Sequence, residues 1–107
     1  MKCFDVAGLA ASQGGEYVLG DKDLHTQACY LVYGLMEAGE GSRLIKPGEG
    51  YEEILCAVNG SLIMHTGRGD VTLSQGNAIH LRGDESFFIS NPNDTSVIYV
   101  MAGGRSI

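Results

Sequence analysis

Two glutamates four residues apart, Glu49 and Glu53, have the clearest capacity for chemistry in this chain. Carboxylate oxygens and water are the ligands that magnesium and calcium prefer, so the pair could hold a hard divalent cation. Glu49, however, lies in the segment KPGEG, 46–50, whose glycines and proline predict a turn. A charge in such a turn is usually solvated, and this interpretation is favoured over a cation site.

Glu53 would lie inside the fold if the strand expected over residues 51–58 turns this side chain inward. A buried carboxylate needs a partner or a raised pKa, because burying an unpaired charge costs several kcal/mol. Lys46, Arg43, a tyrosine or ordered water could be that partner. Two interpretations stay open: an ion pair that ties two strands together, or an acceptor or general base that faces a ligand.

The three histidines, His25, His65 and His80, are not spaced for joint metal binding. No two of them are two or four residues apart, the spacings that place neighbouring imidazoles on one face of a strand or helix. Each is more easily explained as a surface or hydrogen-bonded structural histidine. His80 alternates with Ile79 and Leu81, so its ring lies either in the interior or on the outer face of its strand. It is the first histidine we would mutate.

Short segments rich in β-branched and aromatic residues, separated by glycine- or asparagine-containing turns, predict an all-β chain. The expected strands cover residues 26–38, 42–45, 51–58, 61–66, 71–74, 78–81, 86–90 and 95–102. Turns recur about every eight to twelve residues, which indicates an antiparallel sandwich or barrel. Residues 1–25 are expected to form an N-terminal arm or edge strand that leads into a barrel of residues 26–102. No helix of useful length is expected.

Two of the turns carry specific expectations. Asn59-Gly60 is the dipeptide most typical of a two-residue hairpin, so strand 61–66 is expected to return alongside strand 51–58. The segment GRGD, 67–70, is also expected to form a turn, because glycine and aspartate favour turn conformations.

Size and composition indicate one globular domain, 1–107, without a surface for nucleic acids. Of the 107 residues, 44% are hydrophobic and 19% are charged, an ordinary balance for a folded chain. The net charge of −6 leaves no basic face for a phosphate backbone. Sixteen glycines and two prolines fit many tight turns better than a helical bundle.

The location expected from the sequence is the cytoplasm, without contact to a membrane. No apolar run approaches the roughly 18 residues that a spanning helix needs. Near the N-terminus, Asp5 interrupts a short apolar stretch, which is not typical of a signal peptide. Cys3, Cys29 and Cys56 are odd in number and lack C-x-x-C spacing, so we expect reduced thiols in a reducing compartment.

The segment from Gly41 to Gly60, GSRLIKPGEGYEEILCAVNG, contains the first of two known patterns. Gly41, Glu53 and Gly60 keep the spacing of G-x5-H-x-H-x3-E-x6-G. The two histidine positions of this pattern hold Pro47 and Glu49.

The segment GNAIHLRGDESFFISN contains the second pattern, G-x5-P-x-G-x2-H-x3-N. Gly76 and Asn91 keep their places in it. The proline, glycine and histidine positions hold Arg82, Asp84 and Phe87.

Between Gly39 and about Ala102 the chain resembles the cupin superfamily, whose signature these two patterns are. The resemblance implies an antiparallel double-stranded β-helix, the jelly-roll or cupin barrel, with a pocket in its lumen. In metal-bearing cupins three histidines and one glutamate bind a first-row metal. Only Glu53 of these four is present, so the resemblance implies no bound metal and, at most, a weakly bound divalent cation.

The resemblance also suggests which side chains would line the pocket. Phe87 and Phe88 would form an apolar wall, with further lining from Tyr30, Tyr33, Leu55 and Met64. The candidates for ligand contact are Glu53, Glu49, Phe87, His80, Lys46 and Tyr33. A lumen filled by its own side chains is favoured over an open pocket, because small barrels are commonly filled.

Three functions stay open. The first, which we prefer, is a metal-free barrel that acts as a binding or regulatory module for an unknown small molecule. The second is a small enzyme, of isomerase or lyase type or with a rearranged metal site, that uses Glu53 with a histidine or tyrosine. The third is a structural or interaction protein without a ligand. A solvent-connected cavity around Glu53 would separate these hypotheses.

Two further expectations concern partners and relatives. A homodimer is expected, because strand 26–38 carries apolar residues on both faces and the N-terminal arm could add to a neighbour's sheet. The segments YEEI, 51–54, and IYVMA, 98–102, also resemble ethanolamine-utilisation cupins. That likeness implies no particular activity for this chain.

Overall fold

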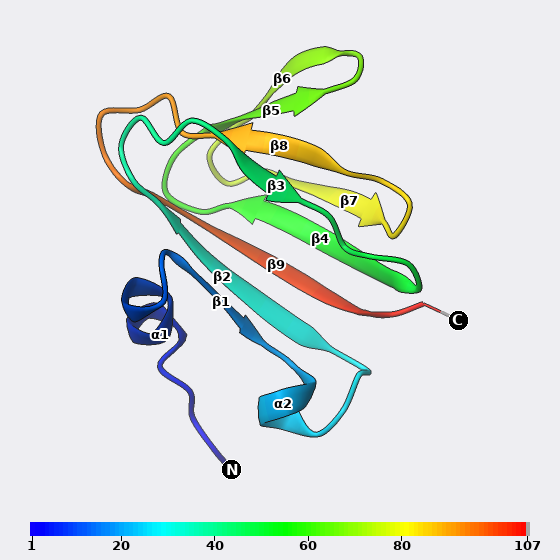
Figure 1. The fold of residues 1–107 in the computed structure, drawn as a ribbon. Helices are drawn as coiled ribbons and strands as arrows, with labels where there is room; N and C mark the ends of the chain where they lie inside the picture. Colours follow the sequence, from blue (N-terminus) through cyan, green and yellow to red (C-terminus); the bar gives the residue numbers. More distant parts are fainter. Residues whose placement is uncertain (107) are drawn as a thin grey trace.

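Two antiparallel sheets packed face to face make up most of the structure, a computed structural model that describes residues 1–106 (Figure 1). The five-stranded sheet has the order β1-β2-β9-β4-β7, and the four-stranded sheet has the order β3-β8-β5-β6. The strands are β1 Glu16–Leu19, β2 Tyr30–Met36, β3 Arg43–Ile45, β4 Tyr51–Ala57, β5 Leu62–Thr66, β6 Gly69–Leu73, β7 Ala78–Arg82, β8 Phe87–Ser90 and β9 Val97–Arg105. The all-β jelly roll predicted from the sequence is confirmed.

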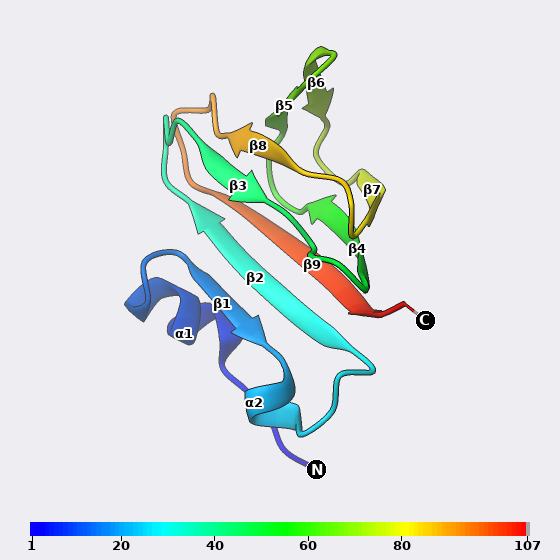
Figure 2. The ribbon, with the colours of Figure 1, turned by 45° about the vertical axis from the view of Figure 1, so that its right-hand side comes forward.

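The hydrophobic core lies between the two sheets, because alternate residues of each strand face inward. In β9 the inward residues Val97, Tyr99 and Met101 are buried, while the residues between them are partly exposed. Ile45 and Ile89 supply the same kind of inward residue from the four-stranded sheet. Figure 2 shows β1, β2, β9 and β4 as one continuous ladder, with β3, β8 and β5 forming the other side.

Gly34 in β2 makes room for the largest fully buried side chain, Tyr99 of β9. A Cβ atom added at Gly34 would lie 2.0 Å from Cζ of the Tyr99 ring. The tyrosine hydroxyl donates to the carboxylate of Glu16 and accepts from Nη1 of Arg43 at 3.1 Å. The buried ring is therefore fixed at its polar end as well as packed along its face.

The N-terminal arm contains one strand, β1, which pairs with β2 at the edge of the five-stranded sheet. It also contains two short helices, α1 Val6–Ser12 and α2 Asp21–Leu24, so the expectation of no helix is corrected. Asp5 caps α1 by accepting from the backbone N–H of Gly8 at 3.0 Å. The helix packs against β1 and β2 through contacts that a local pattern does not reveal. Neither helix has the length or the hydropathy of a membrane span.

The expected hairpin at Asn59-Gly60 is wrong. The turn expected at 67–70 does join β5 and β6, but it is shorter than predicted, because β6 begins at Gly69. β4 pairs with β7 and β9, whereas β5 pairs with β6 and β8. The Asn59-Gly60 segment therefore carries the chain from one sheet to the other. Oδ1 of Asn59 accepts from the backbone N–H of Ile98 at 2.7 Å, which fixes this crossing against β9.

Asn91, the asparagine retained from the second pattern, holds two loops together from a position that is 1% exposed. Its amide donates to the backbone oxygens of Met36, Glu37 and Thr95, at distances of 3.3, 3.0 and 2.9 Å. Its Oδ1 accepts from the backbone N–H of Asn93 at 2.9 Å. The retained residue thus connects the end of β2 to the turn between β8 and β9.

Candidate functional site

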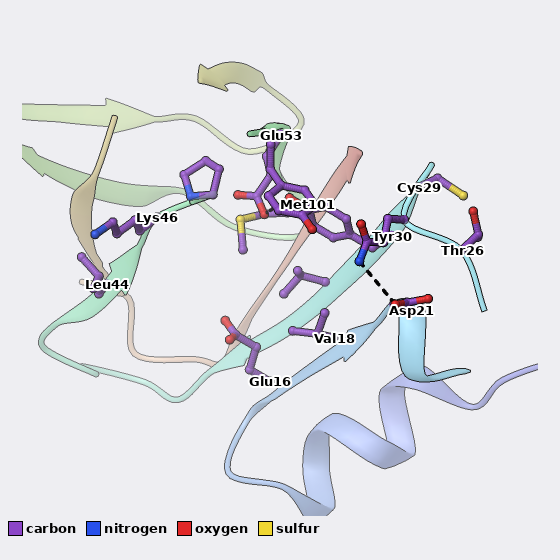
Figure 3. A pocket seen from close by; sticks show the side chains of 15 residues that line it. Glu16, Val18, Asp21, Thr26, Cys29, Tyr30, Leu44, Lys46, Glu53 and Met101 are labelled. Carbon is purple, nitrogen blue, oxygen red and sulfur yellow. Dashed lines mark hydrogen bonds between the residues drawn. The ribbon is translucent and has the colours of Figure 1, made fainter. Parts of the chain in front are cut away.

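A cavity of about 350 Å³ opens between the inner face of the five-stranded sheet and the β3–β4 connection (Figure 3). This volume lies in the range of small-molecule sites, roughly 300–1,000 Å³. Its wall combines apolar side chains, among them Val18, Val32 and Met101, with two tyrosines and several carboxylates. The barrel lumen is therefore partly open rather than filled by its own side chains.

Glu53 lies in this cavity on β4 and is only 6% exposed. The hydroxyl of Tyr30 donates a hydrogen bond to its Oε2 at 2.7 Å. The carboxylate thus faces the interior with a tyrosine as its partner, one of the alternatives that the sequence left open.

Gly103 of β9 allows Tyr30 and Glu53 to meet. In the five-stranded sheet it is the register partner of Tyr30 on one side and of Glu53 on the other. A Cβ atom at this position would lie 2.6 Å from both Cζ and Oη of Tyr30. Because Gly103 has no side chain, the hydroxyl of Tyr30 on β2 can pass over β9 and reach the carboxylate of Glu53 on β4.

The second oxygen of Glu53 is directed to the cavity. Oε1 has no hydrogen-bond partner within residues 1–106, where every fully buried side-chain oxygen or nitrogen does have one. Oε1 is therefore open to solvent or to a ligand. Since a carboxylate accepts several hydrogen bonds, this oxygen is free to receive a donor from a bound molecule.

Burial raises the pKa of Glu53 above the ordinary value of a glutamate. The hydrogen bond from Tyr30 acts in the opposite direction, and the negative charge of Glu16 raises this pKa further. Burial also raises the pKa of the Tyr30 hydroxyl well above its ordinary value, with the hydrogen bond to Glu53 adding to the effect. Tyr30 therefore stays a proton donor to Glu53 at neutral pH.

Neither cation considered as a partner for Glu53 pairs with it. Lys46 lines the cavity, but its ammonium group points away from the Glu53 carboxylate in Figure 3. Arg43 donates to the carboxylate of Glu40 and to backbone oxygens, as well as to Tyr99. Among residues 1–106 the ion pair of a lysine or arginine with a carboxylate is Arg43–Glu40, and the contacts His65–Asp70 and His80–Glu52 are ion pairs only when the histidine is protonated.

Two of the residues expected in the pocket lie on the outside of the five-stranded sheet. The side chain of His80 is 55% exposed, and its Nε2 lies 2.7 Å from Oε1 of Glu52. Tyr33 alternates with the buried residues Val32 and Gly34, so it faces away from the cavity. Both expectations are corrected: each strand was placed properly, but sequence alone did not show which face of it is inward.

Phe87 and Glu49 also lie outside this cavity. Phe87 is 8% exposed and packs in the core, while its neighbour Phe88 is 47% exposed on the outer face. Glu49 lines a different hollow, with Lys46 and Asp84, at the turns before β4 and β8. Glu49 and Glu53 therefore line different hollows, and Glu49 is exposed in its turn, as the favoured interpretation of a solvated charge expects.

Leu55 and Met64, two further candidates for pocket lining, are core residues instead. His25 is exposed at the end of α2, where it adopts a left-handed conformation with a φ of 58°. His65 is fixed by Asp70 at 2.8 Å and by Ser90 at 2.7 Å, on the outer face of the four-stranded sheet. None of these residues lines the cavity.

The residues present do not fit the three-histidine, one-glutamate metal site. Pro47 lines the cavity but has no ligand atom, and the aromatic side chain of Phe87 has none either. Residues 1–106 contain no group of three or more histidine, cysteine, aspartate or glutamate side chains arranged to hold a metal ion. The chemistry of this cavity is that of carboxylates and phenols.

Sequence reasoning missed several residues that shape the site. Glu16 of β1 and Tyr51 of β4 both line the cavity, and Gly103 positions Tyr30. The signal for Gly103 was the pair Gly103-Gly104 within a β-rich segment, where glycine often marks a close approach of neighbouring groups. Glu16 gave no signal, because its strand belongs to the weakly patterned N-terminal arm.

Replacing Glu53 with glutamine is expected to stabilise the protein increasingly as pH rises from about 4.3, the ordinary glutamate pKa, through the raised pKa of Glu53 in the folded protein. The pKa of Glu53 is higher in the folded protein than in the unfolded chain. The contribution of the neutral carboxyl to folding stability is therefore fully present below the unfolded pKa. That stability is lost as pH rises through the folded pKa, whereas glutamine stays neutral throughout. The measurement is Tm against pH for wild type and Glu53→Gln. The exposed Glu49→Gln is the control, and a Tm difference for Glu53→Gln that does not change with pH would contradict the assignment.

No protein-family model matches the chain, and no curated protein sequence matches it. Solved structures do resemble it. A cupin domain of an XRE-family transcriptional regulator from Enterobacter cloacae is 17% identical, with a TM-score of 0.67 over 87% of this chain and 99% of that chain. A predicted oxalate decarboxylase from Thermotoga maritima is 23% identical, with a TM-score of 0.66 over 87% of this chain and 85% of that chain.

A third similar structure is a sugar phosphate isomerase of a cupin superfamily from Silicibacter pomeroyi. It is 17% identical, with a TM-score of 0.64 over 92% of this chain and 64% of that chain. At such identities the likeness concerns the fold. The narrower likeness to ethanolamine-utilisation cupins is not shown by these comparisons.

Proposed function

The chain has the cupin fold, and we propose that it is a metal-free cupin barrel whose cavity beside Glu53 binds a small molecule. One observation carries the proposal. Glu53 is 6% exposed, with one oxygen bonded to Tyr30 and the other open to a cavity of about 350 Å³. Burying a carboxylate destabilises a fold, so a site that keeps one facing an open cavity is typical of recognition.

A regulatory role is the form of this function that we prefer. The similar cupin domain from Enterobacter cloacae belongs to an XRE-family transcriptional regulator. In this chain the cavity contains hydrogen-bonding groups and apolar walls without a metal-binding cluster in residues 1–106. Such a lining suits binding of an intact ligand.

An isomerase or lyase is the second candidate, and the Tyr30–Glu53 pair is the observation that favours it. A carboxylate with a raised pKa beside a phenol can serve as base and acid in proton transfer. The structures from Silicibacter pomeroyi and Thermotoga maritima are described as an isomerase and a predicted decarboxylase. The histidine that this hypothesis first included does not line the cavity, so Tyr30 would take its place.

The test is an NMR titration with three probes of one shape: benzylammonium, benzyl alcohol and benzoate. At least one probe should shift the backbone amides of cavity residues saturably. Val18→Trp, which fills the cavity from a valine that is 52% exposed, should abolish the shifts. Val71→Trp replaces a valine that is 50% exposed outside the cavity and should leave them unchanged. Absence of saturable shifts with all three probes, or binding that survives Val18→Trp, contradicts the proposal.

Purified protein is expected to contain no tightly bound transition metal, because the inherited ligand positions hold Pro47, Glu49 and Phe87. The measurement is elemental analysis after dialysis against buffer without a chelator. Iron, manganese, nickel or zinc near one equivalent per chain would contradict the expectation.

We also propose that the protein is a homodimer through the outer face of its five-stranded sheet. Ile54 and Val58 are 52% and 42% exposed there, beside the partly exposed Ile98 and Val100 of β9. A stable two-fold contact over this face would bury more than roughly 1,000 Å². Light scattering at micromolar concentration should give the dimer mass, with Ile54→Glu shifting it to the monomer. A monomeric wild type would contradict the proposal.

The cytoplasm is the compartment that we propose for this module. Cys3 and Cys29 are exposed free thiols, and Cys56 is a partly exposed one. Thiols of this kind are stable in a reducing compartment.

A further inference from the structure

The cavity has an excess of negative charge on its lining. Glu16 and Glu53 both line it, and neither takes part in an ion pair within residues 1–106. Figure 3 shows the two carboxylates pointing into the same space from β1 and β4. Arg43 is occupied by Glu40, and the Lys46 ammonium group points away. Glu16 accepts a hydrogen bond from the neutral Tyr99 hydroxyl, and its negative charge still acts on Glu53. A positive charge placed between Glu16 and Glu53 would therefore relieve the repulsion between the two carboxylates.

Aromatic rings accompany these carboxylates. Tyr30 and Tyr51 both line the cavity and contact each other edge to face, with ring centroids 5.9 Å apart and planes at 72°. The face of a tyrosine ring attracts cations through its quadrupole, and the attraction strengthens where water is excluded. The same wall thus combines hydrogen-bond acceptors with aromatic rings, both of which can favour a positive ligand.

The surrounding walls favour an organic cation over a metal ion. Val18, Val32, Leu44 and Met101 supply apolar surface next to the carboxylates. A divalent cation needs six or more oxygen ligands and would keep its water molecules against these apolar groups. Residues 1–106 also lack a cluster of three metal-ligating side chains. An ammonium ion with an apolar substituent can bind the carboxylates through its N–H groups and pack its substituent against the apolar side chains.

We propose that the ligand of this cavity is a small protonated amine with an apolar substituent, held through its ammonium group between Glu53 and Glu16. The ammonium N–H groups donate to Oε1 of Glu53, the oxygen that Tyr30 leaves free. The apolar substituent packs against Val18, Val32 and Met101. This inference rests on the proposed function and names the chemical class of its ligand.

The experiment compares the dissociation constants of benzylammonium, benzyl alcohol and benzoate, measured by NMR at a pH where the amine is protonated. The three probes share one ring and differ in charge. Benzylammonium should bind at least about tenfold more tightly than benzyl alcohol, and benzoate should bind most weakly. Magnesium chloride at matched ionic strength should not displace benzylammonium. Displacement by magnesium would assign the site to a metal ion and overturn the inference.

Variants separate charge recognition from folding. Glu53→Gln keeps the shape and the acceptor for Tyr30, so it should reduce the preference for benzylammonium over benzyl alcohol to within about threefold. Glu49→Gln, an exposed position outside the cavity, should keep the full preference. A preference that survives Glu53→Gln would overturn the inference, and so would equal or tighter binding of benzyl alcohol or benzoate. In both cases, binding that Val18→Trp abolishes would leave the proposed function intact. If none of the three probes bound, the proposed function and this inference would both be overturned.

Discussion

Gly34→Ala is expected to destabilise the protein by about 3 kcal/mol or more, which corresponds to a loss of more than roughly 10 °C in Tm. The added Cβ would lie 2.0 Å from Cζ and 2.2 Å from Cε2 of Tyr99. Tyr99 is fully buried and cannot turn aside, because its hydroxyl is bonded to Glu16 and Arg43. The measurement is thermal or urea unfolding followed by circular dichroism.

The matched control for this substitution is Gly41→Ala. Nothing lies within 4 Å of a Cβ at Gly41, and its φ does not require glycine. This variant should unfold within about 0.5 kcal/mol of wild type. If Gly34→Ala were as stable as Gly41→Ala, the packing of Tyr99 between β2 and β9 would be wrong.

Asn91→Ala should cost about 3 kcal/mol, because one buried side chain serves several backbone groups. Alanine would leave the carbonyls of Glu37 and Thr95 and the N–H of Asn93 without this partner. Asn91→Asp should be nearly as damaging, since a carboxylate cannot donate to the carbonyls. Urea unfolding of both variants is the measurement.

Asn77→Ala serves as the control for the loss of an amide. Asn77 is exposed, and its side chain makes no hydrogen bond with the described residues. We expect a change within about 0.5 kcal/mol. Equal stability of Asn91→Ala and Asn77→Ala would show that Asn91 does not connect the two loops.

The strands could be predicted from the sequence because their signal is local. The segment of β9 is rich in β-branched residues, which predicted a strand, and Val97, Tyr99 and Met101 lie on its buried face. In β4 a period near two places Glu53 and Leu55 inward. Alternation defines two faces for every strand. The sequence can therefore locate a strand even where it does not show which of the two faces is buried.

The failures arose where the decisive contacts are far apart in the sequence. Asn59-Gly60 has a strong local preference for a hairpin, but β5 is paired by β8, a strand that comes later in the chain. His80 and Tyr33 lie on strands predicted in the right place, and each faces outward because its neighbours fill the core. No local pattern states which face of a strand another sheet will cover.

Glu53, Tyr30 and Lys46 were predicted from the sequence to be pocket residues, and all three line the cavity, but how they are arranged was missed. Glu53 was identified through its place in the first pattern, whereas Tyr30, Glu16 and Gly103 come from three other strands. Their proximity depends on β9 lying between β2 and β4. Because the strand order is a property of the whole chain, this arrangement requires the structure.

Burial of the ionised Glu53 is expected to destabilise the barrel at neutral pH, although the hydrogen bond from Tyr30 partly offsets this effect. Replacing the buried carboxylate with a neutral group should raise stability at neutral pH, and Tyr30 already has a hydroxyl that can bond to either. Sites that reduce stability are typical of binding or catalysis. This is the physical basis for placing function at the cavity rather than at the outer histidines.

The pKa of Glu53, measured by carboxyl carbon NMR in the ligand-free protein, tests the central claim most directly. A buried carboxylate that faces a cavity beside Glu16 should titrate above the ordinary glutamate value of about 4.3. Addition of benzylammonium should lower this pKa, because a cation stabilises the ionised form. An ordinary or depressed pKa in the free protein, unchanged by any of the three probes, would contradict the assignment of this cavity as the functional site.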